Sequence, residues 1–509
     1  MPERLLHRAS LCLGLLAVLA LLALPAGAAA KPSKKGGSGT EHVQPPVETS
    51  EGGLEQLPGR LGCLAQGKAS IQLCGKARAL KDPGVGFGSR AIAISPDGRN
   101  VYVASSKSDS IAIFVRDRKT GALSQSKGNA GCVAAKAAES CALGIGLIGP
   151  NSVAVSPDGR NVYATSRGGS SITTFLRNRA TGALRELPPS ASGCISGIGF
   201  PTCTPGRGLA DPDVVVISPD GRNVYVGAFA GNGVASFSRA GRAGALTQLG
   251  GTAGCINLGG TEGCAPGVEI GAIEGMAISE SGSAVYTAAA ASSAVGVFAR
   301  DRSTGALTQG TGASGCITNT AVTGCALGYE FKGVNALAVA PKGGDVYATS
   351  LTSNSLTTFR PISGGVGLSQ PPGPDREIEK EKGPGKETVP AAEGTPSPNG
   401  CTVFLRSPGC AFGVAMQAPE GLALSPDGSS VYVTAFETGA IDVFDRNLES
   451  GVVAQKPGPR GCVAPAKVHG CTLGRALKGT GSIVVSPDGR NVYSTSSLSN
   501  AVDIFRRIE

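Results

Sequence analysis

Short runs that alternate between apolar and small residues recur along the chain, and each run stops at a sharp turn. Residues 92–94 read Ile-Ala-Ile, residues 95–98 read Ser-Pro-Asp-Gly and residues 101–103 read Val-Tyr-Val. Because side chains alternate between the two faces of a strand, this pattern is typical of short strands joined by a Pro-Gly turn. Two further runs, residues 111–114 and 122–125, follow before the pattern starts again. The pattern therefore predicts units of four antiparallel strands.

The Ser-Pro-Asp-Gly turn is repeated at a nearly constant interval. It begins at Ser95, Ser156, Ser218, Ser425 and Ser486, and degenerate copies begin at Ser279 and Ala340. Self-similarity at a fixed period indicates a solenoid, a propeller or another repeat array. Seven units of four strands predict an all-β fold, a seven-bladed β-propeller.

The aromatic residues occupy fixed positions in these units. The second strand of each unit carries Tyr102, Tyr163, Tyr225, Tyr286, Tyr347, Tyr432 or Tyr493. The third strand carries Phe114, Phe175, Phe237, Phe298, Phe359, Phe444 or Phe505. A buried aromatic ring removes roughly 150–250 Å² from water. We therefore expect these rings to form the core between neighbouring blades rather than a ligand cage.

The two ends of the repeat region predict how the ring closes. The last unit stops after its third strand, at residues 504–507, and residues 53–56 form a fourth strand that has no unit of its own. The N-terminal strand should therefore complete the C-terminal blade. Such closure removes the exposed strand edges that promote aggregation.

Three segments differ in composition from the repeats, which we assign to residues 51–509. Residues 1–30 combine early arginines, an apolar stretch and an alanine-rich end, which is typical of a signal peptide. Residues 31–50 are rich in Lys, Gly, Ser and Pro and read as a flexible leader. Residues 371–399 are rich in Pro, Gly, Glu and Lys, and we expect a disordered loop inserted in the propeller. No later segment is long and apolar enough to predict a membrane span.

Fourteen of the fifteen cysteines form evenly repeated pairs, and the remaining one, Cys12, lies in the predicted signal peptide. The pairs are Cys63 and Cys74, Cys132 and Cys141, Cys194 and Cys203, Cys255 and Cys264, Cys316 and Cys325, Cys401 and Cys410, and Cys462 and Cys471. In an exported protein such pairs predict local disulfides, each in a loop that joins the fourth strand of one blade to the next blade. Zinc is the weaker alternative, because the chain has no Cys-x-x-Cys and only three histidines.

Composition narrows the functional classes. The net charge of +9 is modest for 509 residues, so it does not predict nucleic-acid binding, although it suits anionic envelope polymers. The absence of tryptophan excludes WD-type and tryptophan-docking blades. We expect a monomeric protein that is secreted or otherwise extracytoplasmic.

The repeat unit also carries a family resemblance. Residues 155–163 read Val-Ser-Pro-Asp-Gly-Arg-Asn-Val-Tyr, and Ser-Ile-x-x-Phe and Thr-Gly-Ala-Leu follow at residues 171–175 and 181–184. This unit resembles the seven-bladed lactonase-like propellers, which include propeller-type 6-phosphogluconolactonases, cycloisomerases and surface proteins with Tyr-Val-Thr-Asn repeats. The resemblance covers residues 53–509, and it implies the fold and a possible lactone-opening activity. Family members often have a histidine before the turn proline, where all seven copies here have Ser or Ala.

The residue five positions before each turn start is polar in six of the seven units. Around the ring these residues are Arg90, Asn151, Asp213, Glu274, Asn335 and Glu420, with Gly481 as the seventh. At the channel mouth they could bind an ion or a small ligand, and their oxygens suit Ca²⁺. They could also provide a general base, or they could simply meet water in the channel.

These observations leave two main functional hypotheses. The first is a secreted or cell-envelope propeller that acts as a binding or scaffold protein, whose basic turns on the face opposite the cysteines would bind an anionic wall polymer. The alternative is a hydrolase of a lactone or similar cyclic ester, with Glu274 or Asp213 as the base and Arg90 as the group that holds the substrate. A third hypothesis is a repeat protein whose ligand is a metal ion.

Overall fold

The computed structural model describes residues 53–67, 73–84, 90–136, 139–363, 365–371, 400–405, 407, 409–466, 468 and 470–508. These residues belong to one compact unit, Thr49–Glu509. The predicted signal peptide, the leader and nearly all of the predicted disordered loop lie outside the described residues. No helix among the described residues is long and apolar enough to cross a bilayer.

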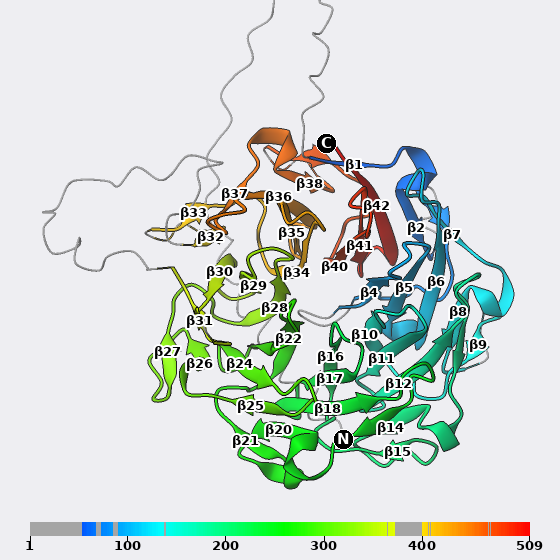
Figure 1. Ribbon diagram of the computed structural model, residues 1–509. Coiled ribbons are helices and arrows are strands. Elements are labelled where there is room, and N and C mark those ends of the chain that lie inside the picture. Colours follow the sequence, from blue (N-terminus) through cyan, green and yellow to red (C-terminus); the bar gives the residue numbers. More distant parts are fainter. Residues whose placement is uncertain are drawn as a thin grey trace, which may run out of the picture. The chain divides into compact units, whose positions relative to one another are not determined.

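Seven sheets, antiparallel except for one short outer strand in each, are arranged in a ring, as Figure 1 shows, so the predicted seven-bladed propeller is confirmed. Blade 1 holds β4 (Ile92–Ile94), β5 (Asn100–Ser105), β6 (Ser110–Arg116), β7 (Leu123–Gln125), β8 (Cys132–Ala134) and β9 (Ala142–Leu143). Blade 2 holds β10 (Pro150–Val155), β11 (Asn161–Ser166), β12 (Ser171–Arg177), β13 (Leu184–Glu186), β14 (Cys194–Ser196) and β15 (Thr204–Pro205). Blade 3 holds β16 (Pro212–Ile217), β17 (Asn223–Ala228), β18 (Gly233–Arg239), β19 (Leu246–Gln248), β20 (Cys255–Leu258) and β21 (Ala265–Gly267).

The remaining blades follow the same order from the channel outwards. Blade 4 holds β22 (Ile273–Ile278), β23 (Ala284–Ala289), β24 (Ala294–Arg300), β25 (Leu307–Gln309), β26 (Gly312–Thr318) and β27 (Cys325–Leu327). Blade 5 holds β28 (Val334–Val339), β29 (Val346–Ser350), β30 (Ser355–Pro361), β31 (Leu368–Ser369), β32 (Cys401–Val403) and β33 (Ala411–Phe412). Blade 6 holds β34 (Pro419–Leu424), β35 (Ser430–Ala435), β36 (Ala440–Arg446), β37 (Val453–Gln455), β38 (Cys462–Ala464) and β39 (Thr472–Leu473). Blade 7 holds β40 (Thr480–Val485), β41 (Asn491–Ser496), β42 (Ala501–Arg507), β1 (Leu54–Gln56), β2 (Cys63–Ala65) and β3 (Gly75–Lys76).

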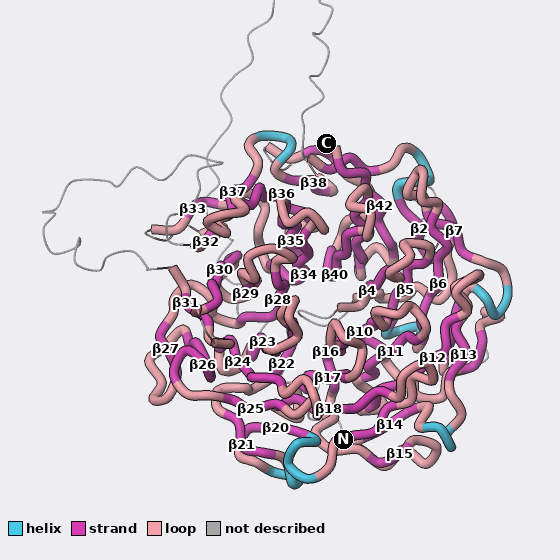
Figure 2. The backbone as a smooth tube through the Cα atoms, in the orientation of Figure 1, coloured by secondary structure: helices cyan, strands magenta, loops and turns pink. Residues whose placement is uncertain are grey.

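The outer part of each blade differs from the predicted single fourth strand. In blade 1, β7 pairs with one end of β6 and β8 pairs with the other end, and a short 3-10 turn separates them. A further short strand, β9, runs parallel to β8. Such 3-10 turns (Figure 2) are η1 (Gly59–Gly62), η3 (Gly128–Ala130), η4 (Pro189–Ala191), η5 (Gly251–Gly254) and η8 (Gly458–Arg460). Two others, η2 (Ser106–Ser108) and η6 (Thr261–Gly263), follow β5 and β20 instead.

The split outer strand corrects the prediction for the cysteines. All seven disulfides form as paired above, from Cys63–Cys74 to Cys462–Cys471. The prediction that both cysteines of a pair lie in a loop is wrong for the first cysteine, which belongs to an outer strand such as β8. The chain returns to the sheet at Cys132 because the next residue, Val133, is buried in the core between blades 1 and 2.

Ring closure follows the predicted scheme. Leu54 pairs with Arg507 at one end of β42, and Cys63 pairs with Asp503 nearer its other end. The first described strands of the chain thus supply the outer part of the blade that the last strands begin. The side chain of Leu54 is buried in the core between blades 6 and 7, so closure also completes a hydrophobic interface.

The core lies between the blades rather than within any one of them. Tyr102 of blade 1 packs with Val153 and Phe175 of blade 2, and both aromatic rings are fully buried. Blade 3 and blade 4 meet in the same way through Tyr225 and Phe298. The predicted role of the repeated aromatic residues as an inter-blade core is confirmed.

An arginine at the end of the third strand joins six of the seven blades to the blade before it. In blade 2, Arg177 Nε donates to the Tyr102 hydroxyl at 2.8 Å, and Nη2 donates to both Asp97 carboxylate oxygens at 3.0 Å and to Asn100 Oδ1 at 2.6 Å. We call this arrangement the arginine clamp. Its arginines are Arg116, Arg177, Arg239, Arg300, Arg446 and Arg507.

One interface, between blades 4 and 5, lacks both halves of the arginine clamp. Between blades 4 and 5, Pro361 stands at the arginine position and Ser281 stands at the aspartate position. The Tyr286 hydroxyl has no hydrogen bond to the residues that the structure describes. Both halves of the clamp are therefore replaced together, and no unpaired charge is left behind.

A glutamine forms a second repeated link at the outer edge. Gln125 Oε1 accepts from the Arg78 amide at 2.9 Å, and Nε2 donates to the carbonyls of Arg78 and Gly131. Blade 2 has Glu186 instead, which accepts from the Ile145 amide but as a carboxylate cannot donate. Burial, which outweighs this hydrogen bond, raises the pKa of Glu186 to about 7.

Candidate functional site

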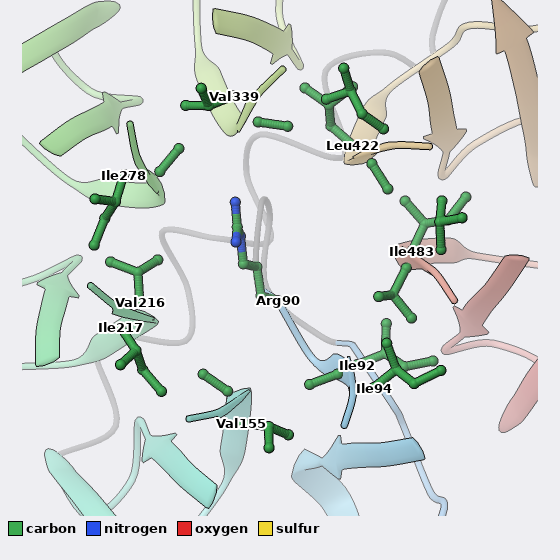
Figure 3. A pocket seen from close by; sticks show the side chains of 18 of the residues that line it. Arg90, Ile92, Ile94, Val155, Val216, Ile217, Ile278, Val339, Leu422 and Ile483 are labelled. Carbon is green, nitrogen blue, oxygen red and sulfur yellow. The ribbon is translucent and has the colours of Figure 1, made fainter. Parts of the chain in front are cut away.

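The first strands of the seven blades surround a central cavity of about 540 Å³. Its walls are Ile, Val, Leu, Ala and Pro side chains, and Arg90 and Ser425 are the only polar residues among those that line it. Figure 3 shows Arg90 projecting into the middle of this cavity, with Ile278, Ile483 and the other labelled aliphatic residues around it. We call the side with the Ser-Pro-Asp-Gly turns the turn end of the channel, and the other side the polar end.

Arg90 spans the channel. It precedes β4 of blade 1, and its Nη2 donates to the Leu337 carbonyl of blade 5 at 2.9 Å. The side chain is exposed to the channel interior, and the surrounding walls lower the pKa of the guanidinium by desolvation. A guanidinium remains charged in proteins, so Arg90 places a permanent cation among apolar walls.

Asn151 and Asp213 lie side by side at the polar end, and both are fully buried. Asn151 Nδ2 donates to Asp213 Oδ1, and Thr165 donates to Asn151 Oδ1 at 3.1 Å. Arg167 Nε donates to Asp213 Oδ1 at 2.8 Å, and Nη2 donates to Oδ2. The bidentate contact fixes the carboxylate plane of Asp213.

Burial and charge act in opposite directions on Asp213. Desolvation raises the pKa of its carboxyl to about 6, although Arg167 and the hydrogen bond from Asn151 pull it down. For Arg167, desolvation is outweighed by Asp213 and its neighbours, so the pKa of the guanidinium is raised. The pair is therefore ionised at neutral pH and can take up a proton in mild acid.

Glu274 and Glu420 complete the acidic part of the ring, and both side chains are buried. Burial raises the pKa of Glu420 well above its ordinary value, and the charge of Glu274 raises it further. The Glu274 charge also acts on Arg167. A Glu420 carboxylate oxygen lies 3.2 Å from the point where a side chain at Gly481 would begin. The glycine thus leaves room for the carboxyl group.

Asn335 serves an interface rather than the channel. Its Nδ2 donates to the Pro419 carbonyl of blade 6 at 2.8 Å, and its Oδ1 accepts from Thr349 at 2.9 Å. Of the six predicted ring residues, the structure thus brings Asn151 and Asp213 into contact and links Glu274 electrostatically to Glu420. Arg90 and Asn335 point elsewhere.

The repeat pattern did not single out Arg167, which holds Asp213. Arg167 directly follows β11, where the other blades have Ser, Phe, Ala or Leu. Alignment of the seven repeats would have shown this residue, because Arg167 is the one charged residue among the seven equivalent positions. The Arg167 guanidinium lies over the ring of Phe229 in blade 3. The distance between Arg167 Cζ and the centre of the ring is 5.7 Å.

The positions and contacts of the buried carboxylates also bear on the predicted Ca²⁺ site. Within the described part of the chain, no group of three or more His, Cys, Asp or Glu side chains could hold a metal ion. Asp213 directs its oxygens at Arg167 and Asn151. A Ca²⁺ ion would need several such oxygens together.

Comparison with known families agrees with this architecture. Residues 83–140, which include Arg90 and β4 to β8, match the family model described as Lactonase, 7-bladed beta-propeller. Over these residues the chain is similar to that family, and the whole ring has the seven blades that the family description names. No curated protein matches it in sequence.

Several solved structures resemble this lactonase-like propeller. The periplasmic gluconolactonase of Pseudomonas aeruginosa is 17% identical over 72% of this chain and 83% of its own, with a TM-score of 0.46. A protein from Lactobacillus plantarum has the same identity, coverage and TM-score. Hydrazine synthase of Kuenenia stuttgartiensis is 15% identical over 83% of this chain and 96% of its own, with a TM-score of 0.47.

Proposed function

We propose that this lactonase-like propeller is an exported hydrolase that opens a cyclic ester at the polar end of its channel. The observation that carries the proposal is the group of carboxyls from three blades, Asp213, Glu274 and Glu420. Burial raises the pKa of Asp213 to about 6 and that of Glu420 well above its ordinary value. Carboxyls with such pKa values can accept and donate protons near neutral pH.

The proposed roles follow from the contacts of each group. Asp213, held by Arg167 and Asn151, accepts a proton from water as the water oxygen attacks the ester carbonyl carbon. The bond between that carbon and the ring oxygen then breaks. Glu420, whose pKa burial raises well above its ordinary value, donates its proton to the departing alkoxide. The product is a hydroxy acid, and water is the only co-reactant.

A panel of lactones tests this proposal. The mature protein is assayed with a sugar lactone, a phosphorylated sugar lactone and an aliphatic lactone, beside the variants Asp213→Asn and Glu420→Gln. Loss of a positioned acid or base lowers the rate roughly 10²- to 10⁴-fold. Glu280→Gln removes an exposed turn carboxylate and should leave kcat/KM unchanged. Wild-type kcat/KM in Asp213→Asn, with an intact fold, would exclude Asp213 as the base.

A binding or scaffold function is the second candidate, and a specific observation favours it. The polar atoms of three ring residues form hydrogen bonds between neighbouring blades: those of Asn151, Asp213 and Asn335. Such contacts are typical of residues that hold a ring of blades together. The turn face carries Arg99, Arg222 and Arg490 as exposed side chains. Salt-sensitive co-sedimentation of the protein with isolated anionic envelope polymer, abolished by Arg→Ala changes at these sites, would support this function.

The seven disulfides indicate an oxidising, extracytoplasmic compartment. We extend this to a secreted monomer from which residues 1–30 have been removed. N-terminal sequencing of the exported protein should find a start close to residue 31, and light scattering should give the mass of one chain. An uncleaved N-terminus or a stable dimer would contradict these assignments.

A further inference from the structure

The turn end of the channel has a chemistry unlike that of the polar end. Its lining is aliphatic from Ile92 and Val153 outwards, and Pro157, Pro219 and Pro426 of the turns stand at its mouth. These three prolines are exposed to solvent, so the cavity opens on this side. Cavities of roughly 300–1,000 Å³ are the size that holds small ligands.

Arg90 closes the inner end of this cavity. Of the five N–H donors of its guanidinium, one is used by the Leu337 carbonyl. Among the described residues, no carboxylate lies within ion-pair distance of Arg90. Two arginines described above differ from Arg90, because Arg177 of the clamp holds Asp97 and Arg167 holds Asp213. Arg90 is therefore a cation with spare donors at the end of an apolar tube.

The turns at the mouth of the cavity carry more unpaired cationic than unpaired anionic side chains, with Glu280 as the exposed carboxylate among them. The turn carboxylates Asp97, Asp158 and Asp220 are each neutralised by a clamp arginine. Arg99 and Arg222, in the same turns, are exposed and form no ion pair with the described residues. The uncompensated charge around the opening would draw an anion towards it.

We propose that the turn end of the channel binds an anionic amphiphile, a carboxylate on an unbranched aliphatic chain, with its head group on Arg90. The chain lies against the Ile, Val and Leu walls, where burial of CH₂ groups is favourable. The head accepts charge-assisted hydrogen bonds from the free guanidinium N–H groups. This site lies beyond the proposed hydrolytic centre and does not depend on it.

Isothermal titration calorimetry with four matched probes tests the proposal on the mature full-length protein. Decanoate carries both the head and the chain, decanol lacks the charge, decyltrimethylammonium reverses it and acetate lacks the chain. Decanoate should bind best, with a negative heat-capacity change from apolar burial. Equal binding of decyltrimethylammonium, or no binding of decanoate, would overturn the proposal.

Variants locate the site. Arg90→Met should weaken decanoate binding roughly tenfold or more, because a charge-assisted contact is lost. It should leave decanol unchanged, and Arg90→Lys should retain most of the decanoate affinity. Arg99→Met removes one positive charge from the same face outside the cavity and is the matched control. An equal loss in Arg99→Met would overturn the proposal, because it would show that the ligand senses only surface charge.

A second pair of variants keeps the test decisive if Arg90→Met unfolds. Ile278→Trp fills the cavity from its wall and should abolish decanoate binding, while circular dichroism confirms the fold. Asp213→Asn changes the polar end and should leave decanoate binding intact. Loss of binding in Asp213→Asn, or its survival in folded Ile278→Trp, would place the ligand elsewhere and overturn the proposal.

Discussion

Two interfaces share the same aromatic packing but differ in their polar contacts. One lies between blades 1 and 2, and the other lies between blades 4 and 5. The first joins its aromatic core to a buried Arg177 that holds Asp97 and the Tyr102 hydroxyl. The second has the same aromatic core, with Tyr286 and Phe359 in one cluster, but Pro361 and Ser281 in place of the clamp. The shared element is therefore hydrophobic packing, and the clamp is an addition to it that must be present or absent as a whole.

The largest effect should come from removing one half of a clamp. Arg177→Met leaves Asp97, Asn100 and the Tyr102 hydroxyl without their partner. Breaking a buried pair costs about 3 kcal/mol, the lower part of the usual range, because Asp97 keeps some contact with water. Chemical denaturation should show this loss. Arg179→Met, an exposed arginine two residues further on, should change the stability by less than about 0.5 kcal/mol.

The pH dependence of stability should separate the clamp carboxylates from the carboxyls buried without an ion-pair partner. Burial alone would raise the pKa of Asp220, but hydrogen bonds from Ser218, Arg222 and Arg300 lower it to about 2. Its contribution is present above its unfolded value near 3.9 and is lost as pH falls towards about 2. Glu186 has the opposite sign, because its pKa is raised to about 7 and its contribution is lost as pH rises through that value.

The free energy of unfolding should therefore fall on both sides of an optimum in mild acid. Glu186→Gln restores the glutamine of the other blades and should remove part of the fall above pH 6. Denaturation of wild type and variant at pH 5 and pH 8 checks this. A variant that gains nothing at pH 8 relative to pH 5 would contradict the assignment of Glu186.

Deleting one hydroxyl should distinguish the two interfaces directly. Tyr102→Phe removes the acceptor of Arg177 Nε and the donor to the Gly182 carbonyl, and should cost about 1–2 kcal/mol. Tyr286→Phe removes a hydroxyl without a hydrogen bond to the described residues, and should change stability by less than about 0.5 kcal/mol. Equal losses in the two variants would mean that the clamp adds nothing to the packing.

The smallest effect should come from building the missing clamp. Ser281→Asp with Pro361→Arg recreates both halves between blades 4 and 5. A double-mutant cycle should give a favourable coupling of only about 0.5–1 kcal/mol. The coupling is small because the clamp arginine also needs an Asn acceptor, and this interface has Ala284 at that position. Either single variant should be neutral or destabilising. Additive effects would show that the interface cannot accommodate a clamp.

The sequence was most informative where a residue repeats with the period of the blades. The tyrosine and phenylalanine positions, the disulfide pairs and ring closure could be predicted because each depends on strand periodicity. The split outer strand could not, since Cys132-Val133-Ala134 is too short a run to be distinguished from a loop. The sequence also could not predict that the Arg90 side chain points into the channel. Seven equivalent positions predict a common location, but they do not predict which side chains point into the channel and which point into an interface.

The candidate site shows the same limit. Asp213 and Asn151 were identified by position, but their partner Arg167 lies in the turn after β11 and reaches Asp213 only through the fold. The raised pKa of Asp213 depends on its burial between blades, which no motif encodes. Sequence repeats therefore predict the scaffold well, and they predict chemistry only where a residue breaks the repeat.

For the exported chain that we propose, the pairing of β1 with β42 sets an order of events. Translocation delivers the N-terminal strand first, and its partner, some 450 residues later in sequence, arrives last. Each disulfide, in contrast, joins cysteines 9 or 11 residues apart and can form as soon as its own segment has emerged. Oxidation can thus proceed blade by blade during export, while the ring closes only after the whole chain has crossed, which makes the last step of assembly a check on completeness.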